Sequence, residues 1–103
     1  MQFGLKDEQL GKIILVFAEF KELKSALLFG SRAKGNFKPS SDIDIAIKCG
    51  NFSFDDLLKL NNSLDELNLP YKFDILVFEK IKDKELIGLI NRIGIVIYEK
   101  EIN

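Results

Sequence analysis

Two acidic residues with strand spacing follow a small-residue turn in the first half of this 103-residue chain. The turn is Gly30-Ser31, which ends an apolar segment, and Asp42 and Asp44 come after it. Residues i and i+2 of a strand share a face, so we expect the two carboxylates side by side. Close carboxylates repel unless a cation lies between them, and a glycine turn lets backbone N–H groups approach a phosphate. This combination predicts nucleotide chemistry supported by a divalent metal.

A third acid, Asp74, interrupts the apolar segment 71–78. A charge in a buried strand is costly unless it is paired or metal-bound, so we expect Asp74 to face the same pocket as Asp42 and Asp44. Three carboxylates can hold two metal ions about 3.5–4 Å apart, the arrangement used for in-line phosphoryl transfer. The alternative interpretation is plainer: an edge strand with one solvated acid, and two exposed acids on a half-buried strand.

Cationic side chains lie close to the turn. From their charge, Arg32 and Lys34 are predicted to contact a triphosphate, and the Ser31 hydroxyl adds a further donor. The sequence contains no histidine, which excludes imidazole bases, His-ligated zinc and Ser-His-Asp catalysis. The predicted metal is therefore held by carboxylates and is Mg²⁺, with Mn²⁺ as an alternative.

Hydrophobic periodicity predicts the elements that position these residues. An amphipathic helix is expected over residues 8–23 with Asp7 as its N-cap. Ser53 and Asp56 predict a capping box at the start of a second helix, and Gly94 is expected to end the last one. The predicted strands are residues 25–29, 42–48, 71–78 and 95–98, the later helices are 54–67 and 84–92, and one helical turn is expected at 32–35.

The order α-β-β-α-β-α-β predicts an α+β, or α/β-like, fold in which helices pack on a small mixed sheet of about four strands. With 103 residues, 47% of them hydrophobic, we expect one domain, residues 1–103. Cys49 is the one cysteine, so no internal disulfide can form. The sequence has neither a signal-peptide pattern nor an apolar stretch of membrane-spanning length, and we expect a cytoplasmic protein without membrane contact.

The run from Gly30 to Gly35, followed by Ser41 to Asp44, resembles the signature of the DNA polymerase β-type nucleotidyltransferase superfamily. In that signature a Gly-Ser turn precedes an Asp-x-Asp/Glu strand, and a third acid lies on a later strand. The length and the closing strand resemble the minimal nucleotidyltransferases (MNT), which pair with HEPN-domain proteins as toxin–antitoxin modules. The resemblance implies a polymerase β-like nucleotidyltransferase core, with Ser41 among the nucleotide contacts.

The resemblance also implies roles for the other matching residues. Gly30 and Ser31 would bind the β- and γ-phosphates of a nucleoside triphosphate. Asp42 and Asp44 would ligate two Mg²⁺ ions, and Asp74 would complete one metal site and help to activate the attacking hydroxyl. A nucleotidyl group, AMP when the substrate is ATP, would be transferred to the acceptor, and pyrophosphate would leave.

The acceptor is expected to arrive with a partner protein. A chain of this length has little room for an acceptor-binding domain, and its net charge of −1 argues against an extended nucleic-acid track. In the family that it resembles, the antitoxin can transfer AMP to a tyrosine of its HEPN toxin, and we adopt that function as a hypothesis. Three alternatives stay open: a binding-only antitoxin, a small-molecule nucleotidyltransferase that works as a homodimer, and a non-catalytic nucleotide sensor.

Overall fold

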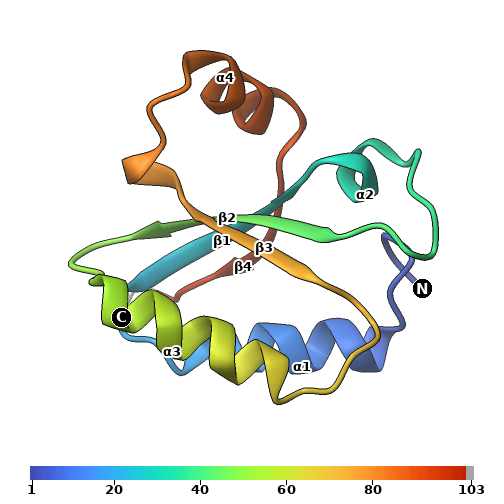
Figure 1. Ribbon diagram of the computed structural model, residues 1–103, viewed down its shortest axis with the longest axis horizontal. Coiled ribbons are helices and arrows are strands. Elements are labelled where there is room, and N and C mark those ends of the chain that lie inside the picture. The colour runs from blue at the N-terminus through green and yellow to red at the C-terminus, as the bar shows by residue number, and fades with distance from the viewer. Residues whose placement is uncertain (102–103) are drawn as a thin grey trace.

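Helices and strands alternate along the chain in the predicted order (Figure 1). The computed structural model describes residues 1–101. The strands are β1 (Leu23–Phe29), β2 (Ile43–Cys49), β3 (Phe73–Val77) and β4 (Ile95–Glu99). The helices are α1 (Asp7–Ala18), α2 (Ser31–Lys34), α3 (Phe54–Asp65) and α4 (Lys84–Ile93), with a 3₁₀ turn, η1 (Phe78–Lys80), after β3. The short α2 confirms the single helical turn expected after the first strand.

The strands form one mixed sheet in the order β3-β2-β1-β4. β1 pairs antiparallel with β2 on one side and with β4 on the other, whereas β2 and β3 run parallel. A parallel pair needs a crossover connection, and the segment containing α3 provides it by returning the chain from Cys49 to Phe73. The predicted α+β fold with a four-stranded mixed sheet is therefore confirmed.

The two faces of the sheet are covered by different helices. α1 and α3 pack together below the sheet as drawn, and α4 lies above it (Figure 1). The larger hydrophobic core lies on the first face and includes Ile43, Ile45 and Ile47 of β2. Ala46 of the same strand instead packs with Ile90 of α4. The alternation expected along β2 is thus confirmed, and the acids share a face with Ala46.

α1 is shorter than its periodicity predicts. It ends at Ala18 rather than at residue 23, because Leu23 is fully buried as the first residue of β1. Its N-cap is Lys6 and not Asp7, and the Lys6 N–H donates to the Gln9 side chain at 3.0 Å. Within residues 1–101, the model contains no helix with the length and apolar character needed to cross a membrane.

The predicted starts of the later helices, at Phe54 and Lys84, are confirmed, whereas α3 ends at Asp65 rather than at residue 67 and α4 at Ile93 rather than at residue 92. The Ser53 N–H donates to the Asp56 carboxylate at 2.9 Å, and the Ser53 hydroxyl accepts from the Asp56 N–H at 3.1 Å, which closes the expected capping box. Gly94 is the C-cap of α4, although with an extended backbone rather than a left-handed one. A Cβ at Gly94 would overlap the Ile90 carbonyl, so the close approach there favours glycine.

Leu28→Ala should destabilise the protein far more than Leu15→Ala. Leu28 is 1% exposed in the middle of β1, whereas Leu15 on α1 is 68% exposed. A buried Leu→Ala change typically costs about 2–5 kcal/mol, and an exposed one stays within about 0.5 kcal/mol. Urea unfolding of both variants measures the difference in the free energy of unfolding. Equal losses would contradict the core described above.

Candidate active site

The pairing of β2 with β3 brings the three predicted acids to one end of the sheet. Asp44 and Asp74 are direct partners in the parallel register. Asp42 comes immediately before β2 and, two residues from Asp44, belongs to the same face. Asp44 is half-buried, while Asp42 and Asp74 are exposed. The neighbourhood predicted for the acids is therefore the observed one.

Asp74 is not the buried charge that its apolar segment suggests. β3 is an edge strand, and Asp74 is exposed near its beginning. Its position beside Asp44 follows from the strand register, not from a burial cost that a metal must offset. The plainer alternative, a solvated acid on an edge strand, is correct for its exposure. The register places Asp74 beside Asp44, and a pocket shared by all three acids stays a prediction.

The pKa of Asp44 reflects the crowding of negative charge. Burial raises the pKa of its carboxyl group above the usual value, and the charges of Asp74 and Asp42 raise it further. The positive charge of Arg32 opposes this shift. A raised pKa means that the ionised carboxylate is disfavoured where it stands, and a cation between the acids would favour it. The electrostatics of the site therefore suit a divalent cation.

The ligand chemistry of the site fits the same conclusion. Carboxylate oxygens are the ligands that Mg²⁺ and Mn²⁺ prefer. With the side chains in their present positions, residues 1–101 contain no group of three His, Cys, Asp or Glu residues close enough to enclose a metal ion. Asp42 and Asp74 are exposed, so both can change rotamer toward Asp44 without movement of the sheet. These three acids are the residues that would hold the metal.

Gly30 directly follows β1 and lies against Asp44. Its backbone has φ +73° and ψ −157°, a conformation open essentially only to glycine. A Cβ at this position would overlap the Oδ2 atom of Asp44. Ser31 then begins α2, and the first N–H groups of a helix have no partners within it. The turn thus combines a glycine that fits against the acid with backbone donors suited to phosphate.

Arg32 does not have the phosphate-facing position predicted from its charge. Its side chain is 2% exposed. Its Nε and Nη2 groups donate to the Ser41 carbonyl at 3.2 and 2.8 Å, so the guanidinium is turned toward the loop that precedes β2. The prediction is wrong because a positive charge near a turn does not reveal which acceptor it meets, and here the acceptors are carbonyls of the chain itself.

The two other predicted nucleotide contacts occupy different environments. Lys34 is exposed at the end of α2 and can reach a ligand held near Ser31. The Ser41 hydroxyl accepts from the Lys38 N–H at 2.8 Å, and the Ser41 carbonyl accepts from Arg32. Ser41 therefore shapes the loop before β2. Direct nucleotide contacts by Lys34 and Ser41 stay predictions.

Two aromatic residues beside the site carry no signal in the sequence. The rings of Phe37 and Tyr71 lie 5.3 and 4.8 Å from the Arg32 Cζ atom. The sequence suggests hydrophobic packing for all aromatic residues, because no spacing links a loop residue to one at the entry of β3. The fold alone places both rings on the same guanidinium.

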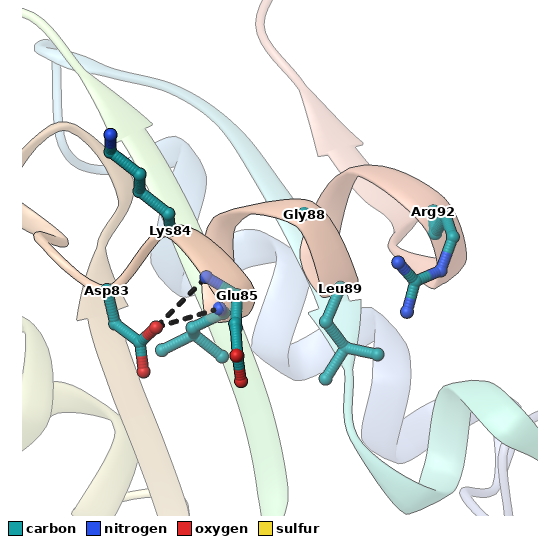
Figure 2. Close-up of a pocket in the computed structure, with 7 residues that line it drawn as sticks. Asp83, Lys84, Glu85, Gly88, Leu89 and Arg92 are labelled. Carbon is teal, nitrogen blue, oxygen red and sulfur yellow. Dashed lines mark hydrogen bonds between the residues drawn. The ribbon is translucent and has the colours of Figure 1, made fainter.

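A hollow beside α4 holds none of the predicted site residues (Figure 2). Glu85, Leu89 and Arg92 are among its lining residues, and all three come from this helix. The carboxylate of Asp83 accepts from the N–H groups of Glu85 and Leu86 at 3.0 and 3.4 Å, as the dashed lines in Figure 2 show. The Asp83 carboxylate therefore already caps the N-terminus of α4. We therefore centre the candidate site on the acids.

Cys49 takes no part in the site. Burial raises the pKa of its thiol to about 12, and the nearby Glu79 carboxylate adds to the shift. The thiolate is the reactive form of cysteine, so a thiol with this pKa is inert at neutral pH. Cys49 is buried as the last residue of β2, where it packs as a small apolar side chain.

Known proteins share both the sequence pattern and the fold. Residues 11–103 match the family described as polymerase beta, nucleotidyltransferase. A Haemophilus influenzae protein named "Probable protein adenylyltransferase MntA" is 29% identical over an alignment of 102 residues, and the match covers 97% of this chain and 88% of that protein.

Two solved structures also resemble this chain. A toxin–antitoxin structure with AMP-PNP has a TM-score of 0.73 at 21% identity, over 89% of this chain and 74% of that chain. The tri-AMPylated Shewanella oneidensis HEPN toxin in complex with its MNT antitoxin has a TM-score of 0.70 at 18% identity, over 93% of this chain and 74% of that chain. At these identities the two likenesses establish the fold.

Gly30→Ala should destabilise the protein, whereas Gly11→Ala should not. Alanine at position 30 meets both an unfavourable backbone conformation and the Asp44 carboxylate. We expect a loss of about 1–3 kcal/mol in the free energy of unfolding. Gly11 lies within α1 with open space around it, so alanine there should stabilise the helix by about 0.5–1 kcal/mol. Urea unfolding distinguishes the opposite signs, and a harmless Gly30→Ala would refute the close contact.

Asp44→Asn should raise the melting temperature at neutral pH. Because the folded pKa of Asp44 lies above its unfolded value, stability falls as pH rises through that interval and stays lower above it. Asparagine removes this penalty and keeps the shape that fits against Gly30. We therefore expect the variant to melt at a higher temperature than wild type at pH 7, and melting curves of the two proteins measure the difference.

The same comparison below about pH 4, near the unperturbed pKa of aspartate, provides the control. There the wild-type carboxyl is protonated, and the two proteins should melt at similar temperatures. An Asp44→Asn variant that melts lower than wild type at pH 7 would mean that the charge of Asp44 stabilises the fold instead.

Proposed function

Because this chain belongs to the polymerase β nucleotidyltransferase family, we propose that it transfers AMP from ATP to a hydroxyl group of a HEPN-domain toxin and so acts as its antitoxin. The strand register that pairs Asp44 with Asp74 carries this proposal. The name of the H. influenzae relative and the AMPylated toxin in the S. oneidensis complex support the choice of AMP and of the acceptor.

In this proposal the turn and the acids divide the reaction between them. Gly30 and Ser31 orient the β- and γ-phosphates through backbone N–H groups and the serine hydroxyl. Asp42, Asp44 and Asp74 hold two Mg²⁺ ions, which when bound supply positive charge to the triphosphate. The acceptor oxygen attacks the α-phosphate, the bond from that phosphorus to the bridging oxygen breaks, and pyrophosphate leaves. Asp74 helps to take up the proton of the acceptor hydroxyl.

The exposure of the acids supports a protein as the acceptor. Asp42 and Asp74 are both exposed, and α4 covers the same sheet face farther along, at Ala46. A hydroxyl presented on the surface of another protein can therefore reach the acids without entering a deep cavity. A partner of this kind also supplies an acceptor-binding surface.

The proposal predicts labelling of the partner from α-labelled ATP with Mg²⁺. The assay uses the chain with the protein encoded by the adjacent gene, present or omitted. Asp42→Ala should lower label transfer by about two orders of magnitude or more, since one lost charge-stabilising contact typically costs roughly 10²–10³ in rate. Asp65→Ala, which removes an exposed acid at the end of α3, is the matched control and should label normally.

The other outcomes each identify a different function. Neutralisation of the toxin by Asp42→Ala without any label would leave a binding-only antitoxin. Transfer to a small molecule in the absence of the second protein would indicate a self-sufficient enzyme, for which a homodimer can provide the acceptor site. Binding of ATP and metal without release of pyrophosphate would indicate a nucleotide sensor.

A further inference from the structure

We propose that Arg32 is a positioning residue that holds together the three segments carrying the predicted chemistry. The segment of α2 that follows Gly30 carries Arg32 itself. Ser41 accepts two of its hydrogen bonds, and Tyr71 packs a ring on its guanidinium. The buried guanidinium of Arg32 thus connects the turn at Gly30-Ser31 with the residues that precede Asp42 and β3. The inference rests on the proposed function for its transfer assay, but not for its metal-binding assay.

The two hydrogen bonds to Ser41 act directly on Asp42. A peptide group is planar, so the Ser41 carbonyl lies in one plane with the nitrogen and the Cα atom of Asp42. When Nε and Nη2 of Arg32 hold that oxygen at 3.2 and 2.8 Å, they fix the backbone from which the Asp42 carboxylate projects. Nη2 also donates to the Pro39 carbonyl at 3.3 Å, which holds the loop at a second point, two residues before Ser41.

The aromatic contacts extend the same support to β3. The Tyr71 ring lies 4.8 Å from the Arg32 Cζ atom, three residues before Asp74. Stacking of a cation on an aromatic face is favourable, and more so where water is excluded. The N–H of Ile43 donates to the Lys72 carbonyl at 2.8 Å, so the starts of β2 and β3 are also joined directly. Arg32 therefore bears on both strands that carry the acids.

A turn at the beginning of the chain completes the site of the guanidinium. Nη1 of Arg32 donates to the Phe3 carbonyl at 2.8 Å. Gly4 makes this possible, because a Cβ at Gly4 would lie 2.7 Å from Nη1 and would overlap the Phe37 ring. Gly4 has no functional group of its own, so a substitution there disturbs Arg32 without removing any group that could touch a substrate.

The contacts of Arg32 require a guanidinium and not merely a positive charge. In the part of the chain that the structure describes, no carboxylate lies within ion-pair distance of Arg32, and its hydrogen bonds all go to backbone carbonyls. Three carbonyls in different directions match the planar fork of arginine, whereas a lysine ammonium is a single point charge. Arg32→Lys therefore keeps the charge and loses the geometry.

The test uses two single variants, Arg32→Lys and Gly4→Ala. Gly11→Ala is the matched glycine control. Circular dichroism and melting curves first establish a temperature at which each variant is folded. Electron paramagnetic resonance then measures Mn²⁺ affinity, and transfer from α-labelled ATP at saturating metal gives kcat and KM. We expect Arg32→Lys and Gly4→Ala to weaken Mn²⁺ binding and to lower kcat by about 10–100-fold, because lost support of metal ligands and small misplacements typically have effects of that size.

The KM for ATP should stay within about threefold of wild type in both variants, because Arg32 does not touch the phosphates, while Gly11→Ala should behave as wild type. A large rise in KM with unchanged kcat and Mn²⁺ binding would identify a phosphate ligand and overturn the proposal. Folded variants with normal kcat and normal Mn²⁺ affinity would also overturn it and leave Arg32 as a support of the fold alone.

If Arg32→Lys or Gly4→Ala does not fold, Tyr71→Leu carries the test, because it removes the ring contact and leaves the guanidinium in place. Gln9→Ala is its control, since Tyr71→Leu also removes the hydrogen bond from the Tyr71 hydroxyl to the Gln9 side chain at 3.4 Å. Failure of the proposed function has a different signature. A wild-type chain that binds Mn²⁺ but transfers no nucleotide would refute the transferase, while a weaker affinity in Arg32→Lys would still support the positioning role.

Discussion

The parallel pairing of β2 with β3 is the constraint on which the rest of the structure depends. It makes Asp44 and Asp74 direct neighbours, although thirty positions separate them in the sequence. A parallel neighbour can be reached only through a crossover, so the chain must pass over one face of the sheet in α3 before β3 begins. Helix α3, which packs on the main core, is therefore also part of the connection that places Asp74 beside Asp44.

The site exists because packing and charge are divided between the two faces of β2. Ile43, Ile45 and Ile47 contribute to the large core under α1 and α3, and this burial stabilises the strand. On the opposite face, Ala46 packs with Ile90 of α4. The ionised form of Asp44 is disfavoured in this arrangement, first by burial and then by the charges of Asp74 and Asp42. Partial burial and charge repulsion thus accompany a surface that can receive a cation.

Periodicity predicted the elements well because it reflects which residues must be buried. The alternation along β2 and the Ser53 capping box are local patterns, and both are present in the structure. The end of α1 was not predictable in this way, because Leu23 is apolar in either a helix or a strand. The role of Arg32 was beyond local patterns altogether, since its acceptors include Phe3, near the start of the chain. Long-range partners of a charged side chain are fixed by the tertiary fold.

The solvent exposure of Asp42 and Asp74 also leaves the site open to water. Both side chains are exposed, and the loops described here do not close over them. Water at high concentration is therefore a constant competitor for any activated phosphate bound at these acids, and hydrolysis would consume the nucleotide without benefit. Shielding has to come from the surface that presents the acceptor, because closing an active site is what excludes such side reactions. Under the proposed function, the loss of ATP to hydrolysis would be small only while the target protein is docked.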